Sequence, residues 1–181
     1  DSLNPTTHHA TTRRDLLPSV FQGIDAAIEA GFRSIKLNCV LMKNQSEAEL
    51  LPLIEFARQK GVLLRFIELM PVSTTDVLSD ANFLSTGSAR KLIEQTLGSL
   101  VPCPEFKTNG PASYFQVPGT DQKIGFIGAM TNLHFCESCN KLRLTADGKL
   151  RPCLGSFLEF DLLNPLRNGC TDAELRELFQ N

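Results

Sequence analysis

Three cysteines of this sequence stand at a spacing that is typical of metal ligands. Cys136 and Cys139 form a C-x2-C pair, and Cys153 follows after thirteen further residues. The Asp-Gly pair at 147–148 is a strong hairpin signal, which folds Cys153 back toward Cys139. Three thiolates can therefore meet at one point, where they suit an iron–sulfur cluster with one open iron, or a zinc ion with His134 as its fourth ligand. The spacing alone does not separate these two kinds of site.

A strand is predicted at residues 34–41, with a lysine on the face opposite its apolar residues. Ile35, Leu37 and Cys39 share one face of this strand, which turns Lys36 to the opposite face. In a barrel that face is the lumen, and a lysine directed inward needs an anion because lysine is rarely buried unpaired. The alternative is a lysine on an exposed sheet face, where no anion is needed.

Two further cations follow the cysteine pair. Lys141 and Arg143 share one face of their segment, opposite Leu142 and Leu144. Two cations immediately after Cys139 predict an anion site beside the metal, with a solvated hairpin face as the alternative.

Predicted helices and strands alternate through the first part of the chain. The helices are expected at 16–30, 46–60 and 89–97, and the strands at 34–41 and 62–70. Ser46 and Glu49 form a capping box at the second helix, whereas Pro52 falls beyond its first turn and indicates a later start or a kink. This alternation predicts an α/β fold with parallel βα units, in a barrel or a doubly wound sheet.

Short strands separated by turn residues are predicted beyond residue 101. They are expected at 114–117, 123–127, 142–145 and 150–152, followed by helical segments near 158–166 and from Thr171, which forms a capping box with Glu174. This change of pattern predicts a small antiparallel α+β subdomain.

The bulk composition is that of a globular protein. The chain has 181 residues, of which 42% are hydrophobic and 21% charged, and its net charge is −2. This near-neutral balance predicts neither a nucleic-acid partner nor a membrane surface, and no apolar stretch approaches the ~20 residues of a membrane span. Only three of the six cysteines are grouped, which favours a reduced intracellular protein with a metal site. The chain begins without Met and stops inside a predicted helix, so we expect a fragment.

The cysteine segment also resembles a known family. The run from His134 to Leu154 is similar to the auxiliary-cluster signature of the GTP 3′,8-cyclases, the radical S-adenosylmethionine enzymes that open molybdenum-cofactor biosynthesis. Residues 34–40 and 65–71 resemble two barrel strands of that family in the same order, and Asp1-Ser-Leu resembles the segment after its fourth strand. The resemblance covers nearly the whole chain.

The resemblance implies a fold and a set of site residues. Residues 1–100 would be the second part of an incomplete, TIM-like βα barrel, and residues 101–181 an auxiliary-cluster subdomain. Two [4Fe-4S] clusters are implied, one holding S-adenosylmethionine and a second binding GTP. The implied site residues of this chain are Cys136, Cys139 and Cys153 for the second cluster, Lys36, Lys141, Leu142 and Arg143 for GTP, and Met70 for S-adenosylmethionine.

The resemblance further implies radical conversion of GTP to 3′,8-cyclo-7,8-dihydro-GTP. No residue of this chain is assigned a catalytic role, and the C-x3-C-x2-C motif of the radical-generating cluster is absent from it, so we expect the chain alone to be inactive. The implied partners are GTP, an electron donor and a cyclic pyranopterin synthase, with a homodimer and a cytoplasmic location also expected.

Two other functions are alternatives to that of a GTP 3′,8-cyclase. A non-catalytic zinc ribbon with His134 as a ligand is one alternative, and a peptide-modifying radical S-adenosylmethionine enzyme is the other.

The sequence differs from the family pattern at one site residue. Lys141 stands where the family pattern has Arg; it keeps the charge but loses the bidentate fork of a guanidinium. Arg65 and Glu68 are predicted to be lumen groups or a structural ion pair, without an assigned role.

Overall fold

The computed structural model describes residues 1–71, 79, 81–137, 139 and 141–180. The chain divides into two units, the first made of residues 1–70 and 75–138, the second of residues 71–74 and 139–181.

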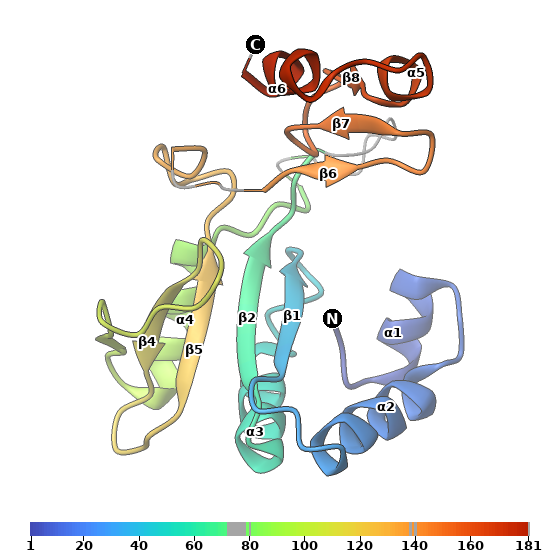
Figure 1. Ribbon diagram of the computed structural model, residues 1–181. Helices are drawn as coiled ribbons and strands as arrows, with labels where there is room; N and C mark the ends of the chain where they lie inside the picture. Colours follow the sequence, from blue (N-terminus) through green and yellow to red (C-terminus); the bar gives the residue numbers. More distant parts are fainter. Residues whose placement is uncertain (72–78, 80, 138, 140, 181) are drawn as a thin grey trace. The chain divides into compact units, whose positions relative to one another are not determined.

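A mixed five-stranded sheet forms the centre of the first unit, with the strand order β1-β2-β5-β4-β3 (Figure 1). The first three strands of this order are parallel, and β4 and β3 are antiparallel to their neighbours. The strands are β1 Lys36–Leu41, β2 Leu63–Glu68, β3 Val101–Pro102, β4 Ser113–Gln116 and β5 Lys123–Ile127.

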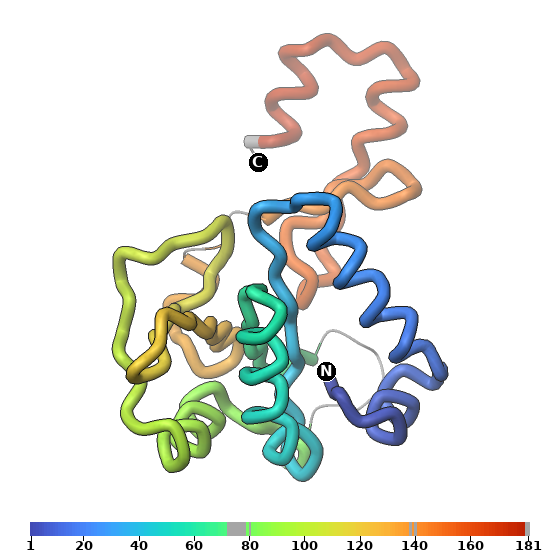
Figure 2. The backbone as a smooth tube through the Cα atoms, turned by 90° about the horizontal axis from the view of Figure 1, so that it is seen from below, coloured from blue at the N-terminus to red at the C-terminus, as the bar shows by residue number. Residues whose placement is uncertain are grey.

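In the described part of the first unit, four helices accompany this sheet: α1 Pro5–Thr12, α2 Leu17–Glu29, α3 Leu50–Lys60 and α4 Thr86–Leu97. α3 and α4 pack side by side and both contact β2 (Figure 2). Their apolar stripes bury Ala57 and Ile93 completely, against Leu64 and Phe66 of β2 in the same core. The alternation of buried and half-buried residues along β2 follows from the period of two of a strand that is covered on one face.

The start of α3 differs from the prediction. Ser46 accepts a hydrogen bond from the backbone N–H of Met42, and the Glu49 carboxylate accepts hydrogen bonds from the Ser2 hydroxyl and the Leu3 N–H. The predicted capping box is wrong because both of its side chains bind elsewhere. The helix therefore begins later, at Leu50, which places Pro52 in the first turn, where proline is tolerated.

The last strands of the sheet come from beyond residue 101, where the sequence predicts a second, antiparallel subdomain. β5 enters between β2 and β4 and runs parallel to β2. Its residues from Ile124 to Ile127 are all buried, as expected for a central strand that is covered on both faces. The sheet thus contains strands from both of the predicted parts, residues 1–100 and 101–181. That these two parts have different roles stays a prediction.

The described residues of the second unit form a three-stranded antiparallel sheet followed by two helices (Figure 1). Its elements are β6 Arg143–Leu144, β7 Lys149–Arg151, β8 Phe160–Asp161, α5 Leu163–Arg167 and α6 Asp172–Gln180. The capping box predicted before α6 is confirmed, since Thr171 and Glu174 exchange hydrogen bonds between side chains and backbone. No helix in the described part of the chain combines the length and the apolar character needed to traverse a lipid bilayer.

Candidate functional site

The three motif cysteines are free thiols with exposed side chains. Cys136 lies near the end of the first unit, whereas Cys139 and Cys153 lie in the second. Among the described residues, no three His, Cys, Asp or Glu side chains are grouped closely enough to hold a metal ion. The meeting of the three thiolates therefore stays a prediction. The donor set itself fits an iron–sulfur cluster, because accessible thiols outside disulfides are the ligands that such clusters take.

His134, the fourth ligand of the zinc alternative, is already engaged through one ring nitrogen. Its Nδ1 lies 3.0 Å from both carboxylate oxygens of Glu137, and both side chains are exposed. Nδ1 is thus held by Glu137, and only Nε2 is left to bind a zinc ion.

The segment that leads to Cys136 is held to the sheet by a buried carboxylate, Glu68. Glu68 is the last residue of β2 and is 1% exposed. Its two oxygens accept hydrogen bonds from the N–H and hydroxyl of Thr86, the N–H and hydroxyl of Thr131 and the N–H of Met130. Burial raises the pKa of this carboxyl, but the hydrogen bonds from Thr131, Thr86 and Met130 outweigh it and hold the pKa below its ordinary value. Glu68 is therefore an ionised anchor.

Lys36 lies where the sequence predicts it. Ile35, Leu37 and Cys39 pack on the core side of β1, which leaves half-buried Lys36 on the other face. Lys36 forms no ion pair within the described residues. A cation on this face is thus available to an anionic ligand, whose identity the fold does not fix.

One row of residues crosses this same face of the sheet. Asn38, Arg65, Gly125 and Tyr114 are register partners on four neighbouring strands. The Nε of Arg65 donates to the side-chain oxygen of Asn38 at 2.9 Å. Gly125 leaves room for the row, because a Cβ there would lie 2.8 Å from Tyr114 Cε1 and 3.0 Å from Arg65 Cγ. Arg65 and Glu68 do not form the ion pair that was one of their two predicted roles: Arg65 binds Asn38, whereas Glu68, three residues further along β2, binds Thr86, Met130 and Thr131.

A charged network covers one face of the second unit's sheet. Arg151 donates to Glu159 through Nε at 3.0 Å, and Lys149 Nζ lies 3.3 Å from Glu159 and 3.1 Å from Asp147. Hydrogen bonds from Arg151 and Lys149 lower the pKa of the Glu159 carboxyl. Arg143, opposite Arg151 in the ladder, forms no ion pair in the described part of the chain.

The remaining predicted residues flank these elements. Lys141 and Leu142 directly precede β6, and Leu142 is 60% exposed. Met70 follows the C-terminal end of β2 and is half-buried. Their predicted roles depend on ligands and stay predictions.

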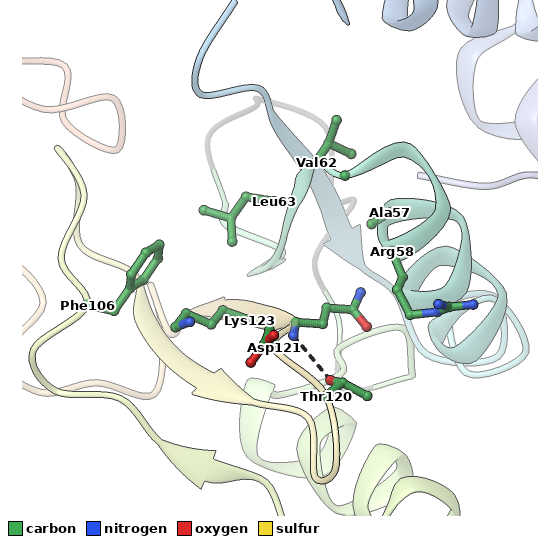
Figure 3. A pocket seen from close by; sticks show the side chains of 10 residues that line it. Ala57, Arg58, Val62, Leu63, Phe106, Thr120, Asp121 and Lys123 are labelled. Atoms are coloured by element: carbon green, nitrogen blue, oxygen red, sulfur yellow. Dashed lines mark hydrogen bonds between the residues drawn. The ribbon is translucent and has the colours of Figure 1, made fainter.

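A pocket of about 490 Å³ lies at the end of the first sheet where β2 begins, opposite to the end that Met70 follows (Figure 3). It is bounded by the end of α3, the start of β2 and the turn before β5, and Lys123 Nζ lies 5.3 Å from the centre of the Phe106 ring at its edge. The pocket includes none of the predicted site residues.

Sequence reasoning left Glu68 without a role, although a signal for it exists. Glu68 continues the buried positions Leu64 and Phe66 in a period of two. A carboxylate in such a series must be buried with hydrogen-bond partners, which is typical of a structural anchor or a functional group.

Comparison with known proteins adds independent information. Residues 62–181 match the protein family described as Molybdenum Cofactor Synthesis C. The GTP 3',8-cyclase of Moorella thermoacetica is 41% identical to this chain over 185 residues, which cover 99% of the chain and 54% of the relative. Those of Thermodesulfovibrio yellowstonii and Rhodopirellula baltica are also 41% identical, over 98% and 99% of the chain and 54% and 50% of the relatives. The chain spans about half the length of the curated relatives it matches.

Proposed function

The chain belongs to the Molybdenum Cofactor Synthesis C family, and from this membership we propose that it forms the substrate-binding half of a GTP 3′,8-cyclase. The observation that carries the proposal is its identity of about 40% to relatives of that name along nearly its whole length. The proposed reaction is the radical conversion of GTP to 3′,8-cyclo-7,8-dihydro-GTP in molybdenum-cofactor biosynthesis.

Cys136, Cys139 and Cys153 would hold a [4Fe-4S] cluster. The proposal is supported by their exposed, free thiols and by the β6–β7 hairpin that brings the chain back before Cys153. When bound, a cluster with three thiolate ligands offers one open iron to the guanine base.

The contacts to the nucleotide would come from Lys36, Lys141, Leu142 and Arg143. Lys36 and Arg143 are the better-supported pair, since neither has an ion pair among the described residues. Charge-assisted hydrogen bonds from such cations bind phosphates strongly and fix their orientation. Their proposed task is to hold the triphosphate so that the ribose and the base keep a reactive arrangement.

The parallel strands β1, β2 and β5 would form part of an incomplete βα barrel. In barrels the active site lies at the C-terminal ends of the strands, which is where Met70 follows β2. Met70 would contact S-adenosylmethionine, with a second [4Fe-4S] cluster held by residues outside this sequence. An electron donor, a cyclic pyranopterin synthase, a homodimer and a cytoplasmic location complete the proposal by family resemblance.

Anaerobic reconstitution of the chain with iron and sulfide tests the proposal. We expect a brown protein with about four irons and four sulfides per chain. Cys139→Ser is expected to abolish iron binding. Cys103→Ser is the matched control, because Cys103 is a free thiol outside the motif, and it is expected to leave the iron content unchanged. Stoichiometric zinc in a colourless protein without sulfide would overturn the proposal in favour of a zinc ribbon.

A further inference from the structure

A carboxylate that forms no ion pair with any described residue is buried at the end of β2. Glu68 is 1% exposed, and its oxygens accept five hydrogen bonds. A buried charge is tolerated only when its hydrogen-bonding capacity is filled. The donors that fill it are therefore as constrained as the carboxylate itself.

These donors come from two separate segments. Thr86 is the first residue of α4, and Met130 and Thr131 belong to the loop that follows β5. The backbone nitrogens of Met130 and Thr131 lie 2.8 Å and 2.9 Å from one carboxylate oxygen of Glu68, and the hydroxyl oxygen of Thr131 lies 2.6 Å from the other. Glu68 thus ties the end of β2 to the loop through short, charge-assisted bonds.

The loop is also turned tightly around this anchor. A Cβ on Gly128 would lie 3.3 Å from the hydroxyl oxygens of both Thr131 and Thr86, so a side chain there would crowd two of the donors. Beyond Thr131, the N–H of Asn132 donates to Gly128, and the N–H of Phe135 donates to Asn132. Backbone hydrogen bonds therefore continue from the anchor to the residue before Cys136.

We propose that Glu68 is a positioning residue that fixes the loop at residues 128–137 and thereby sets the place of Cys136, the first thiol of the proposed cluster. The inference rests on the proposed function, because it assumes that Cys136 is a cluster ligand. Glu68 acts on Cys136 indirectly, through the hydrogen bonds that it accepts from Met130 and Thr131.

Two variants of graded severity test this role in the 181-residue chain. Glu68→Gln keeps the shape of the side chain but replaces one acceptor oxygen with an NH2 group that faces donors. Thr131→Val removes only one of the five donors. Hydrogen–deuterium exchange of the amides of Met130 and Thr131 is expected to accelerate about tenfold or more in Glu68→Gln, because charge-assisted bonds are lost. A smaller acceleration is expected in Thr131→Val.

Iron content and the electron paramagnetic resonance spectrum of the reduced, reconstituted chain provide the second measurement. We expect Glu68→Gln to hold less than about half of the iron of the unaltered chain and to show an altered or heterogeneous cluster signal. Glu55→Gln is the charge-matched control, since Glu55 is an exposed carboxylate bound to Arg58 and Gln59. Ile93→Ala is the control for general destabilisation, because Ile93 is fully buried on α4 and its truncation removes core packing.

The outcomes separate the inference from the function on which it rests. If the unaltered chain takes up no iron, the proposed function fails, and the inference fails with it. If the unaltered chain takes up iron but Glu68→Gln loses no more than Ile93→Ala, Glu68 acts only on general stability and the inference alone is overturned. Unchanged exchange at Met130 and Thr131 in Glu68→Gln would also overturn it.

Discussion

Arg143 lies directly opposite Arg151 in the pairing of β6 with β7, and only Arg151 has a carboxylate partner in the described part of the chain. Like charges on opposite positions of neighbouring strands destabilise a sheet. Glu159 offsets this repulsion for Arg151, whereas no carboxylate of the described residues forms an ion pair with Arg143. An external anion is therefore favoured at Arg143, which agrees with the proposed phosphate contact.

Replacement of Arg143 tests this contact in an enzyme of the relatives' full length that carries this sequence. Arg143→Ala is expected to weaken GTP binding by roughly 1–3 kcal/mol, because one charge-assisted contact is lost. Isothermal titration with GTP measures the change. Arg167→Ala, which removes another exposed arginine of the second unit, is expected to leave the affinity unchanged. Equal affinities for the Arg143 variant and the unaltered enzyme would contradict the assignment.

Lys36 is tested in the same way on the first sheet. We expect Lys36→Ala to lower the affinity for GTP by roughly 1–3 kcal/mol, while cleavage of S-adenosylmethionine in the absence of GTP persists. Lys91→Ala removes an exposed lysine of α4 and serves as the control. A Lys36 variant that loses cleavage of S-adenosylmethionine but binds GTP normally would show that the residue acts on the cofactor instead of the phosphates.

Gly125 is expected to be required for the packing of the row formed by Asn38, Arg65 and Tyr114. Gly125→Ala would place a methyl group 2.8 Å from the Tyr114 ring, which overpacks the sheet and lowers the free energy of unfolding by roughly 1–3 kcal/mol. Urea unfolding measures the difference. Gly23→Ala in α2 meets no atom within 4 Å and is expected to raise the free energy of unfolding by roughly 0.5–1 kcal/mol. Equal midpoints for the two variants would refute the steric argument.

Hydrophobic periodicity predicted most of the elements of the first unit but not all of their partners. α2, β1, α3 and β2 are local patterns, and each has its expected type. The insertion of β5 between β2 and β4 could not be read from the sequence, because a strand's own pattern does not specify which strand it pairs with. The buried run from Ile124 to Ile127 indicates a central strand only after the sheet is known.

Only part of the candidate site could be proposed from the sequence. The spacing of the cysteines and the alternation of apolar residues around Lys36 are patterns within short segments of the chain. The anchoring role of Glu68 depends on Thr86 and Thr131, which lie 18 and 63 residues away in the sequence. Hydrogen bonds over such separations are set by the fold, and no spacing rule encodes them.

We predict that the buried thiol of Cys39 lowers the free energy of unfolding at alkaline pH. The pKa of this thiol is raised from 9.0 to about 11, chiefly by burial; the charged N-terminus of the 181-residue chain lowers it and Glu49 raises it, both by smaller amounts. Between these two pH values the thiol ionises in the unfolded chain but keeps its proton in the folded chain, so the unfolded state binds fewer protons. The free energy of unfolding therefore falls as the pH rises from about 9 to about 11.

Urea unfolding at several pH values across this range, compared between variants, isolates the contribution of Cys39. Cys39→Ala is expected to show a shallower decline than the unaltered chain, whatever its stability at neutral pH, because the titrating thiol is gone. Cys103→Ala removes a thiol that is not buried and is expected to keep the full decline. Parallel declines in Cys39→Ala and the unaltered chain would mean that other groups account for all of the alkaline sensitivity, and the thiol of Cys39 would then have no measurable linkage to folding.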